Sequence, residues 1–357
     1  MSSALTDLCR YPIVQAPMAG GSSGPQLAAA VSEAGGLGFL AAGYKTADGM
    51  YNEIKQLRGL TGQPFGVNLF MPQPALADPS AVEVYRHQLA GEAAWYETPL
   101  GDTDSGGDDN YDAKLAILLE DPVPAVSFTF GCPARDTLDA FAGVGTYTVV
   151  TVTTPEEAQA AQWAGADAVC VQGIEAGGHQ STHRDDPQTD GTGIGLLSLV
   201  SQVRETVQIP ILAAGGLMRG SQIAALLAAG AEAAQLGTAF LVCPESGASP
   251  LHKQALTNPL FVRTELTRAF SGRPARGLVN RFMREHGPYA PAAYPQVHYL
   301  TAGLRKAAAK AGDAQGMALW AGQGHRMARE LPAGRLVRLL AEELDAARTA
   351  VSTGSTQ

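Results

Sequence analysis

Short apolar segments alternate with longer amphipathic segments along most of the chain. Eight of the short segments are almost continuously apolar, which is typical of parallel strands that are covered on both faces. We therefore predict strands at Ile13–Ala16, Leu37–Ala41, Phe65–Leu69, Ala125–Phe130, Tyr147–Val152, Ala168–Gln172, Ile211–Ala214 and Ala234–Leu236.

The amphipathic segments between these strands carry helix start and stop signals. The run Thr154-Pro155-Glu156-Glu157 offers an N-cap, a proline at the first helical position and a capping-box glutamate;. Gly165 then predicts the end of that helix, and Ser221 and Gly230 bracket another helix in the same way. Strands and helices are thus expected to alternate.

A repeated junction supports this alternation. Gly165-Ala166-Asp167-Ala168 precedes one predicted strand, and Gly230-Ala231-Glu232-Ala233 precedes another. Eight such units would close an α/β TIM (β/α)8 barrel. A doubly wound open sheet is the alternative that the pattern leaves open.

Two long segments are not needed to form a minimal eight-stranded barrel. Residues 71–123 form a long insertion between strands three and four, in which Thr98–Asn110 is acidic, glycine-rich and expected to be an exposed loop. Residues 244–325 predict a smaller, mainly helical cap or substrate domain over the barrel mouth. Leu331–Val351 has leucines at helical spacing and fits the eighth barrel helix. The predicted units are a barrel of 1–243 plus 326–351, the cap of 244–325, and a disordered tail of 352–357.

Composition narrows the class of protein. A chain of 357 residues with 41 glycines and a net charge of -9 has no general attraction to nucleic acids or anionic membranes. Its four cysteines are far apart, without metal-ligand spacing, as expected in a reducing compartment. No apolar run approaches the length of a membrane span. We expect a cytoplasmic monomer or homodimer acting on a small molecule, with no metal.

The chemistry-bearing residues cluster where strands end, as they do in barrel enzymes. Strand six runs into Gln172-Gly173-Ile174-Glu175-Ala176-Gly177-Gly178-His179, a glycine-rich loop with a histidine at its tip. The histidine could serve in proton transfer or be a solvated loop residue. Asn68 and Gln172 have amides suited to a flat heterocycle. Glu175 could be a general acid or orient nearby backbone.

Glycines after strands seven and eight predict a phosphate site. Gly215 and Gly216 leave the backbone open to a ligand, and Gly237 with Thr238 adds an N–H and a hydroxyl;. The alternative is that these glycines only make tight turns. Neither a GxxxxGK[ST] nor a GxGxxG motif opens a nucleotide-binding unit.

Together these segments resemble the nitronate monooxygenase family, formerly called 2-nitropropane dioxygenases, and its class I branch in particular. The strand-six segment is the most specific part of the resemblance. The matching segments are Gln15–Met18, Phe65–Phe70, Cys170–His179, Ala213–Gly216, Gln235–Thr238 and Arg273–Gly277. The chain departs from many relatives at Gln180-Ser181, where they have Arg-Gly.

The resemblance implies an FMN-containing barrel that oxidises alkyl nitronates with O2 to carbonyl compounds and nitrite, a detoxification for which propionate 3-nitronate is the typical class I substrate. It implies that His179 is catalytic, either holding the nitronate when protonated or taking a proton from a nitroalkane when neutral. Tyr111, Tyr294 and Tyr299 are candidates for the substrate pocket. The expected FMN contacts are Pro17, Met18, Asn68, Gln172, Gly177, Gly178, Gly215, Gly216, Gln235, Leu236, Gly237 and Thr238.

Two other functions stay open on sequence alone. An FMN-dependent enoyl-ACP reductase has a similar Glu-x-Gly-Gly-His loop, uses NAD(P)H and needs a basic rim for its acidic carrier. A non-catalytic flavin-binding protein is the second alternative. The basic rim that a reductase would need could be formed by Arg263, Arg268, Arg273 and Arg276.

Overall fold

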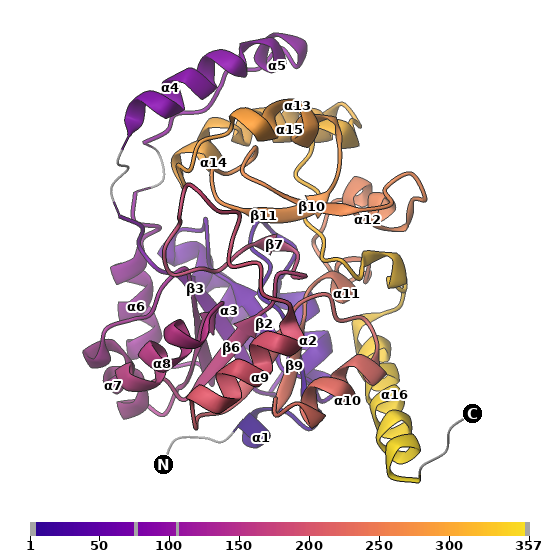
Figure 1. Cartoon of the computed structure of the whole chain (residues 1–357). Helices are drawn as coiled ribbons and strands as arrows, with labels where there is room; N and C mark the ends of the chain where they lie inside the picture. The colour runs from indigo at the N-terminus through magenta and orange to yellow at the C-terminus, as the bar shows by residue number, and fades with distance from the viewer. Residues whose placement is uncertain (1–4, 75–77, 105–106, 354–357) are drawn as a thin grey trace.

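The computed structural model describes residues 5–74, 78–104 and 107–353. Parallel strands hydrogen-bond in the order β1-β9-β8-β6-β5-β4-β3-β2, and a bridge between Val14 and Leu37 joins the two ends of the sheet. The result is a nearly closed, TIM-like barrel (Figure 1). Its strands are β1 (Ile13–Gln15), β2 (Gly38–Ala41), β3 (Phe65–Phe70), β4 (Ala125–Thr129), β5 (Tyr147–Val152), β6 (Ala168–Gln172), β8 (Ile211–Ala214) and β9 (Ala233–Leu236).

Each predicted barrel strand is confirmed to within one residue at either end. The doubly wound open sheet is wrong, because β1 contacts both β9 and the start of β2. Side chains inside the barrel are aliphatic or aromatic and buried, among them Val14 and Phe39. From below, Leu5 and Leu8 pack against this inner cluster.

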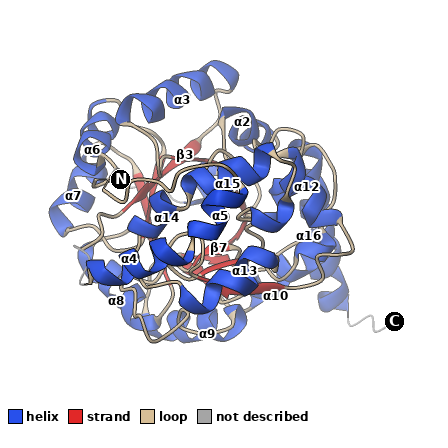
Figure 2. Ribbon diagram, turned by 90° about the horizontal axis from the view of Figure 1, so that it is seen from above, coloured by secondary structure: helices blue, strands red, loops and turns tan. Residues whose placement is uncertain are grey.

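Amphipathic helices surround the strands, as the view from above shows (Figure 2). Their apolar faces form one continuous core with the outer faces of the strands. The short α1 (Leu5–Leu8) lies below the barrel (Figure 1). The surrounding helices are α2 (Pro25–Glu33), α3 (Ala47–Leu60), α6 (Tyr111–Glu120), α7 (Arg135–Gly143), α8 (Pro155–Ala164), α9 (Leu196–Thr206), α10 (Gly220–Ala228) and α16 (Ala333–Thr353).

The start and stop signals predicted for α8 are present in the structure, but the capping-box glutamate bonds to a different backbone N–H than expected. Thr154 Oγ1 accepts from Glu157 N at 3.1 Å at the start of α8, and Gly165 ends the helix in the left-handed region with φ of 102°. The Glu157 carboxylate accepts from Thr153 N at 2.6 Å, one residue before the N-cap. The next predicted helix, α10, begins at Gly220, one residue before Ser221.

The last helix completes the ring by packing between α10 and α2. Gly220 allows the close approach, because a Cβ there would lie 2.3 Å from Leu340 O. Glu343 also accepts from Gly220 N at 2.7 Å. Of the predicted disordered tail at 352–357, residues 352 and 353 belong to α16, and the rest lies outside the described residues.

A cap covers the upper end of the barrel (Figure 1). It is not only helical, because the three-stranded antiparallel sheet β10-β11-β7 lies between barrel and cap helices. Short α11 (Thr238–Leu241) follows the last barrel strand. The other elements here are β7 (Gly178–His179), α12 (Pro250–Thr257), β10 (Thr264–Thr267), β11 (Ala275–Leu278), α13 (Arg281–His286), α14 (Gln296–Leu300) and α15 (Ala302–Lys310).

Part of the long insertion packs on this cap rather than on the barrel. Helices α4 (Pro79–Gln88) and α5 (Ala90–Trp95) lie above it (Figure 1). Tyr85 is fully buried in a cluster with Phe270 and Phe282, and its hydroxyl donates to Ala269 O at 2.8 Å. The insertion thus contributes to both layers, and the domain boundaries given above stay a prediction.

Candidate active site

A cavity of about 420 Å³ lies at the carboxyl ends of the barrel strands. This volume is in the range of small-molecule sites. Its wall combines strand-end residues, such as Asn68 and Gln172, with residues of the cap, such as Trp320. Barrel and cap therefore build one site together.

The structure brings most of the expected cofactor contacts to this cavity. Leu236 is the exception: it is buried in the core between barrel and helices. The reason is strand geometry, because neighbouring side chains face opposite sides of a strand and Gln235 takes the inward side;. The expected contacts that line the cavity are Pro17, Met18, Asn68, Gln172, Gly177, Gly178, Gly215, Gly216, Gln235, Gly237 and Thr238.

His179 also lines the cavity, on the two-residue strand β7, which pairs with β11. Its Nε2 lies 2.9 Å from Ser271 Oγ. Aromatic rings surround the imidazole, with centroids at 5.6 Å for Phe130, 5.4 Å for Tyr294 and 5.7 Å for Trp320. His179 is therefore fixed in the wall of the cavity by a hydrogen bond and aromatic contacts, and the interpretation as a solvated loop residue is wrong.

The imidazoles of this cavity are neutral at physiological pH. Burial lowers the pKa of His179 from 6.5 to about 3, with further lowering by the positive charges of Arg273 and Arg305. Burial likewise lowers the pKa of His252 to about 4 and holds that of His298 well below its ordinary value. A charged imidazole is disfavoured here by desolvation first and by the arginines second.

Both polar strand-end amides bond within the protein. Gln172 donates from Nε2 to His179 O at 3.1 Å and accepts from Ser181 N at 2.8 Å. Gln172 thereby fixes the loop of residues 173–181 that carries His179, called the histidine loop below. Its position at a strand end did not reveal this role. Asn68 donates to Ser127 Oγ at 2.9 Å, which leaves its carbonyl oxygen as the other hydrogen-bonding group of the side chain.

The loops after β8 and β9 make a concave wall of backbone. Gly215 and Gly216 have φ of 145° and 69°, a region that side chains rarely adopt. Thr238 Oγ1 accepts from Gly322 N at 2.9 Å, so the hydroxyl proton is free to be donated to a ligand. Glycine at 177 is required by packing, because a Cβ there would lie 2.5 Å from Gly322 N.

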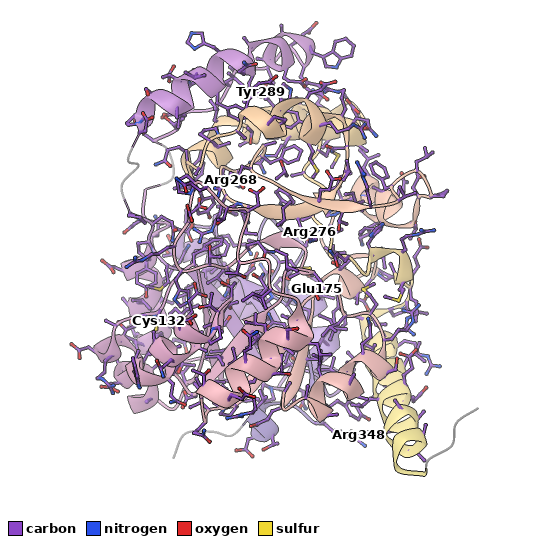
Figure 3. All side chains as sticks on the ribbon, viewed as in Figure 1. Cys132, Glu175, Arg268, Arg276, Tyr289 and Arg348 are labelled. Carbon is purple, nitrogen blue, oxygen red and sulfur yellow. The ribbon has the colours of Figure 1, made fainter. Side chains whose placement is uncertain are left out.

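Glu175 orients backbone. Its two carboxylate oxygens each lie 3.0 Å from Leu196 N at the start of α9, where a negative charge is favourable. Figure 3 shows Glu175 below Arg276, at the junction of barrel and cap. Arg276 donates from Nε to Ile174 O at 2.9 Å. These contacts favour the structural interpretation over the general-acid one.

The three candidate tyrosines are placed differently. Tyr294 and Tyr299 line a second cavity of about 270 Å³, which shares Tyr44 and Phe70 with the larger one. The hydroxyls of Tyr294 and Tyr44 lie 3.0 Å apart. Tyr111 packs in the barrel core and lines neither cavity, so the structure does not support its assignment to the substrate pocket.

One group of side chains in the described residues has metal-ligand spacing. Glu92, Glu285 and His286 lie together in the cap, but Arg281 pairs with both glutamates, at 2.5 and 2.6 Å. The arginine already pairs with both carboxylates, so the group is an ion-pair network.

Comparison with known proteins agrees with this architecture. The family described as nitronate monooxygenase matches residues 2–343. The chain is 45% identical to a nitronate monooxygenase of Pseudomonas aeruginosa over 352 residues, covering 94% of this chain and 96% of that protein. It belongs to the nitronate monooxygenase family. The family consists of oxidoreductases and is flavin-dependent in general.

Solved structures show the same likeness in three dimensions. A nitroalkane oxidase from Streptomyces ansochromogenes is 76% identical, with a TM-score of 0.96, and the match covers 98% of this chain and 100% of that one. FabK from Thermotoga maritima is 28% identical, with a TM-score of 0.74 over 99% and 100% of the two chains. Within the described residues, no helix has the length and apolarity to cross a membrane.

In this member of the nitronate monooxygenase family, several cavity residues escaped sequence reasoning. Most of them come from the cap or from loops without a periodic pattern, so no strand end marked them; Phe130 ends a predicted strand, but an apolar side chain there gave no chemical signal. For His298 and Arg305 alone, a spacing of seven residues, or two helical turns, could have suggested that both side chains lie on the same helical face;. The missed residues that matter most are Tyr44, Phe130, His252, His298, Arg305 and Trp320.

Proposed function

We propose that this chain uses FMN to oxidise alkyl nitronates with O2, giving carbonyl compounds and nitrite, and that propionate 3-nitronate is a substrate. One observation carries the proposal: a partly buried, neutral His179 lines the same cavity as the barrel-mouth glycines Gly215, Gly216 and Gly237. Family membership supports the same chemistry.

The cavity fits FMN. Gly215, Gly216 and Gly237 present backbone without side chains, and Thr238 has a hydroxyl proton to donate, which suits a phosphate;. Asn68 offers a carbonyl oxygen to the ring system. When bound, the flavin would take electrons from the substrate and pass them to O2.

His179 acts best on a substrate that is already a nitronate. A group with a pKa of about 3 is a poor base at neutral pH, since a general base works best near the operating pH. As a neutral ring it can still donate a hydrogen bond. When the Ser271 hydroxyl donates to Nε2, the ring proton resides on Nδ1, which can then donate to a nitronate oxygen.

The enoyl-ACP reductase hypothesis loses the basic rim that it requires, although the similar Glu-x-Gly-Gly-His loop remains. Of the four arginines expected to form a basic rim, three are buried: Arg268, Arg273 and Arg276. Arg268 pairs with Asp185 at 2.9 Å. The exposed Arg263 pairs with Glu265 at 3.1 Å. The three buried guanidiniums bond to the segment that follows β6, so they do not form a docking surface for an acidic carrier.

Anaerobic mixing of the flavin-loaded protein with propionate 3-nitronate tests the proposal. We expect rapid bleaching of the flavin absorbance, and nitrite after air is admitted. NADH in place of the nitronate should bleach slowly or not at all. Fast bleaching by NADH, with none by the nitronate, would instead identify a reductase.

A further inference from the structure

Arg305 gives the cavity its charge. Among the described residues that line the cavity, Arg305 is the only lysine or arginine, and no aspartate or glutamate lines it. The three histidines in the wall are neutral, as shown above. The described side chains that line the cavity therefore carry a single formal charge, which is positive.

The guanidinium is held in place by neutral groups. Arg305 Nη2 donates to His298 O at 2.7 Å, and Nε donates to Thr301 Oγ1 at 3.2 Å. Thr301 is itself fixed, because its hydroxyl donates to Phe270 O at 2.6 Å. In the described part of the chain, no ion pair and no hydrogen bond is found at Nη1.

Arg273, a second arginine near His179, is fully buried and is a useful contrast to the partly buried Arg305. All three of its nitrogens are engaged: Nε donates to Gln180 O at 3.3 Å, Nη1 to Gln73 Oε1 at 2.7 Å, and Nη2 to Thr182 O. Arg273 does not line the cavity. It is a structural cation, whereas Arg305 faces the space where a ligand binds.

A desolvated cation without a counter-charge is costly. Guanidinium groups pair best with planar anions such as carboxylates. Different segments form the Arg305 side of the cavity and the predicted phosphate site. Arg305 bonds to His298, whose ring stacks on Tyr44 at 3.9 Å, and Tyr44 follows β2. The predicted phosphate site follows β8 and β9, and β1 lies between β9 and β2 in the barrel.

We propose that Arg305 binds a carboxylate at the end of the substrate remote from the nitronate, so that the preferred substrates are carboxylated nitronates. The inference rests on the proposed function for the identity of the reacting group. It adds the residue that would select one class of nitronate over another. His298 positions the guanidinium through its backbone carbonyl, and Tyr44 stacks on the His298 ring.

Inert analogues test this binding without turnover. Succinate has the shape of propionate 3-nitronate, with a carboxylate in place of the nitronate, and butyrate matches propyl-1-nitronate in the same way. Calorimetry on the holoenzyme should show tighter binding of succinate than of butyrate. A charge-assisted hydrogen bond predicts a preference of about ten- to a hundredfold.

Three variants make the test specific. Arg305→Met should abolish the preference for succinate, and Arg305→Lys should keep part of it. Arg305→Gln retains side-chain donors for Thr301 and His298 while removing the charge, so it should behave as Arg305→Met even if the methionine variant folds poorly. Lys306→Met is the control, since Lys306 is exposed on the same helix and its loss should leave the preference intact.

Turnover measurements distinguish failure of the carboxylate site from failure of the proposed nitronate oxidation. The ratio of kcat/KM for propionate 3-nitronate over propyl-1-nitronate should fall about ten- to a hundredfold in Arg305→Gln. An unchanged preference in both Arg305→Met and Arg305→Gln would overturn the carboxylate site. If wild type prefers succinate but neither nitronate reduces the flavin, the proposed function fails and the carboxylate site stands.

Discussion

His179 Nε2 lies 2.9 Å from Ser271 Oγ, and the two residues are 92 positions apart in the chain. The serine hydroxyl is also 3.2 Å from Arg273 O, so it can donate either to that carbonyl or to the imidazole. When the hydroxyl donates to Nε2, the ring proton is on Nδ1; when it donates to the carbonyl, Nε2 can carry the proton and donate to the hydroxyl, and the ring is neutral in both cases;. The contact therefore lets a neutral histidine act as a donor.

Replacing His179 with Asn should retain FMN and remove most turnover. The imidazole is not expected to hold the cofactor, whereas loss of a positioned donor typically costs two to three orders of magnitude. Flavin-to-protein absorbance ratios and nitrite release measure the two properties. Near-full activity in this variant would show that His179 has no catalytic role.

The pH dependence of turnover distinguishes a neutral from a charged His179. With its pKa lowered to about 3, the imidazole stays neutral from pH 5 to pH 8. The kcat/KM for a preformed nitronate should then be nearly flat over that range. If the imidazolium were required, kcat/KM would fall about tenfold per unit above its pKa. Stopped-flow flavin reduction with freshly ionised substrate provides the measurement.

Gly237→Ala tests the predicted phosphate site without straining the fold. The backbone φ at Gly237 is -104°, and an added Cβ would make ordinary contacts, 3.5 Å from Ala16 Cβ and 3.6 Å from Met18 Sδ. We expect unchanged thermal stability of the flavin-free protein and FMN affinity weaker by about tenfold, or roughly 1.4 kcal/mol.

Gly59→Ala is the matched control for that experiment. Gly59 is exposed in α3, and nothing lies within 4 Å of an added Cβ. This variant should bind FMN as wild type does and gain up to about 1 kcal/mol of stability from helix propensity. Equal FMN affinity in both variants would argue against a phosphate beside Gly237.

His252 should make the protein less stable in mild acid. Its Nε2 donates to Trp320 O at 2.9 Å, and its pKa is lowered from 6.5 to about 4. The unfolded chain therefore binds more protons between those values, and stability falls as the pH falls from 6.5 towards 4. From pH 7 to pH 5 this one group contributes a loss of about 2 kcal/mol.

Urea unfolding of wild type and His252→Gln at both pH values checks this contribution. Glutamine can donate to the same carbonyl but does not titrate. The variant should lose about 2 kcal/mol less than wild type on acidification. An identical loss in the two proteins would mean that His252 titrates normally in the folded state.

The barrel could be predicted from sequence because its signals are local. A run such as Tyr147–Val152 is buried on both faces, and a glycine such as Gly165 ends its helix wherever the rest of the chain lies. The same reasoning located Gln172 and His179 at the mouth, since strand ends mark it. It could not say that Gln172 bonds to the loop, because that contact depends on where the loop folds back.

The cap could not be predicted in the same detail. Its elements are short, and their partners are distant in sequence: β7 pairs with β11 nearly a hundred residues later, and Tyr85 is buried against Phe282. Arg273 and Arg276 were interpreted as a basic rim because charged residues are usually exposed. Their burial reflects tertiary hydrogen bonds that no local pattern encodes.

The pairing of β7 with β11 has a consequence for protein engineering. His179 enters the site on a strand whose registered partners, Ala275 and Arg276, belong to the segment beyond the barrel. A chimera that takes its barrel from one relative and its cap from another would thus join two halves of one small sheet. The transferable unit for changing substrate preference is therefore the cap together with the histidine loop, exchanged as a pair.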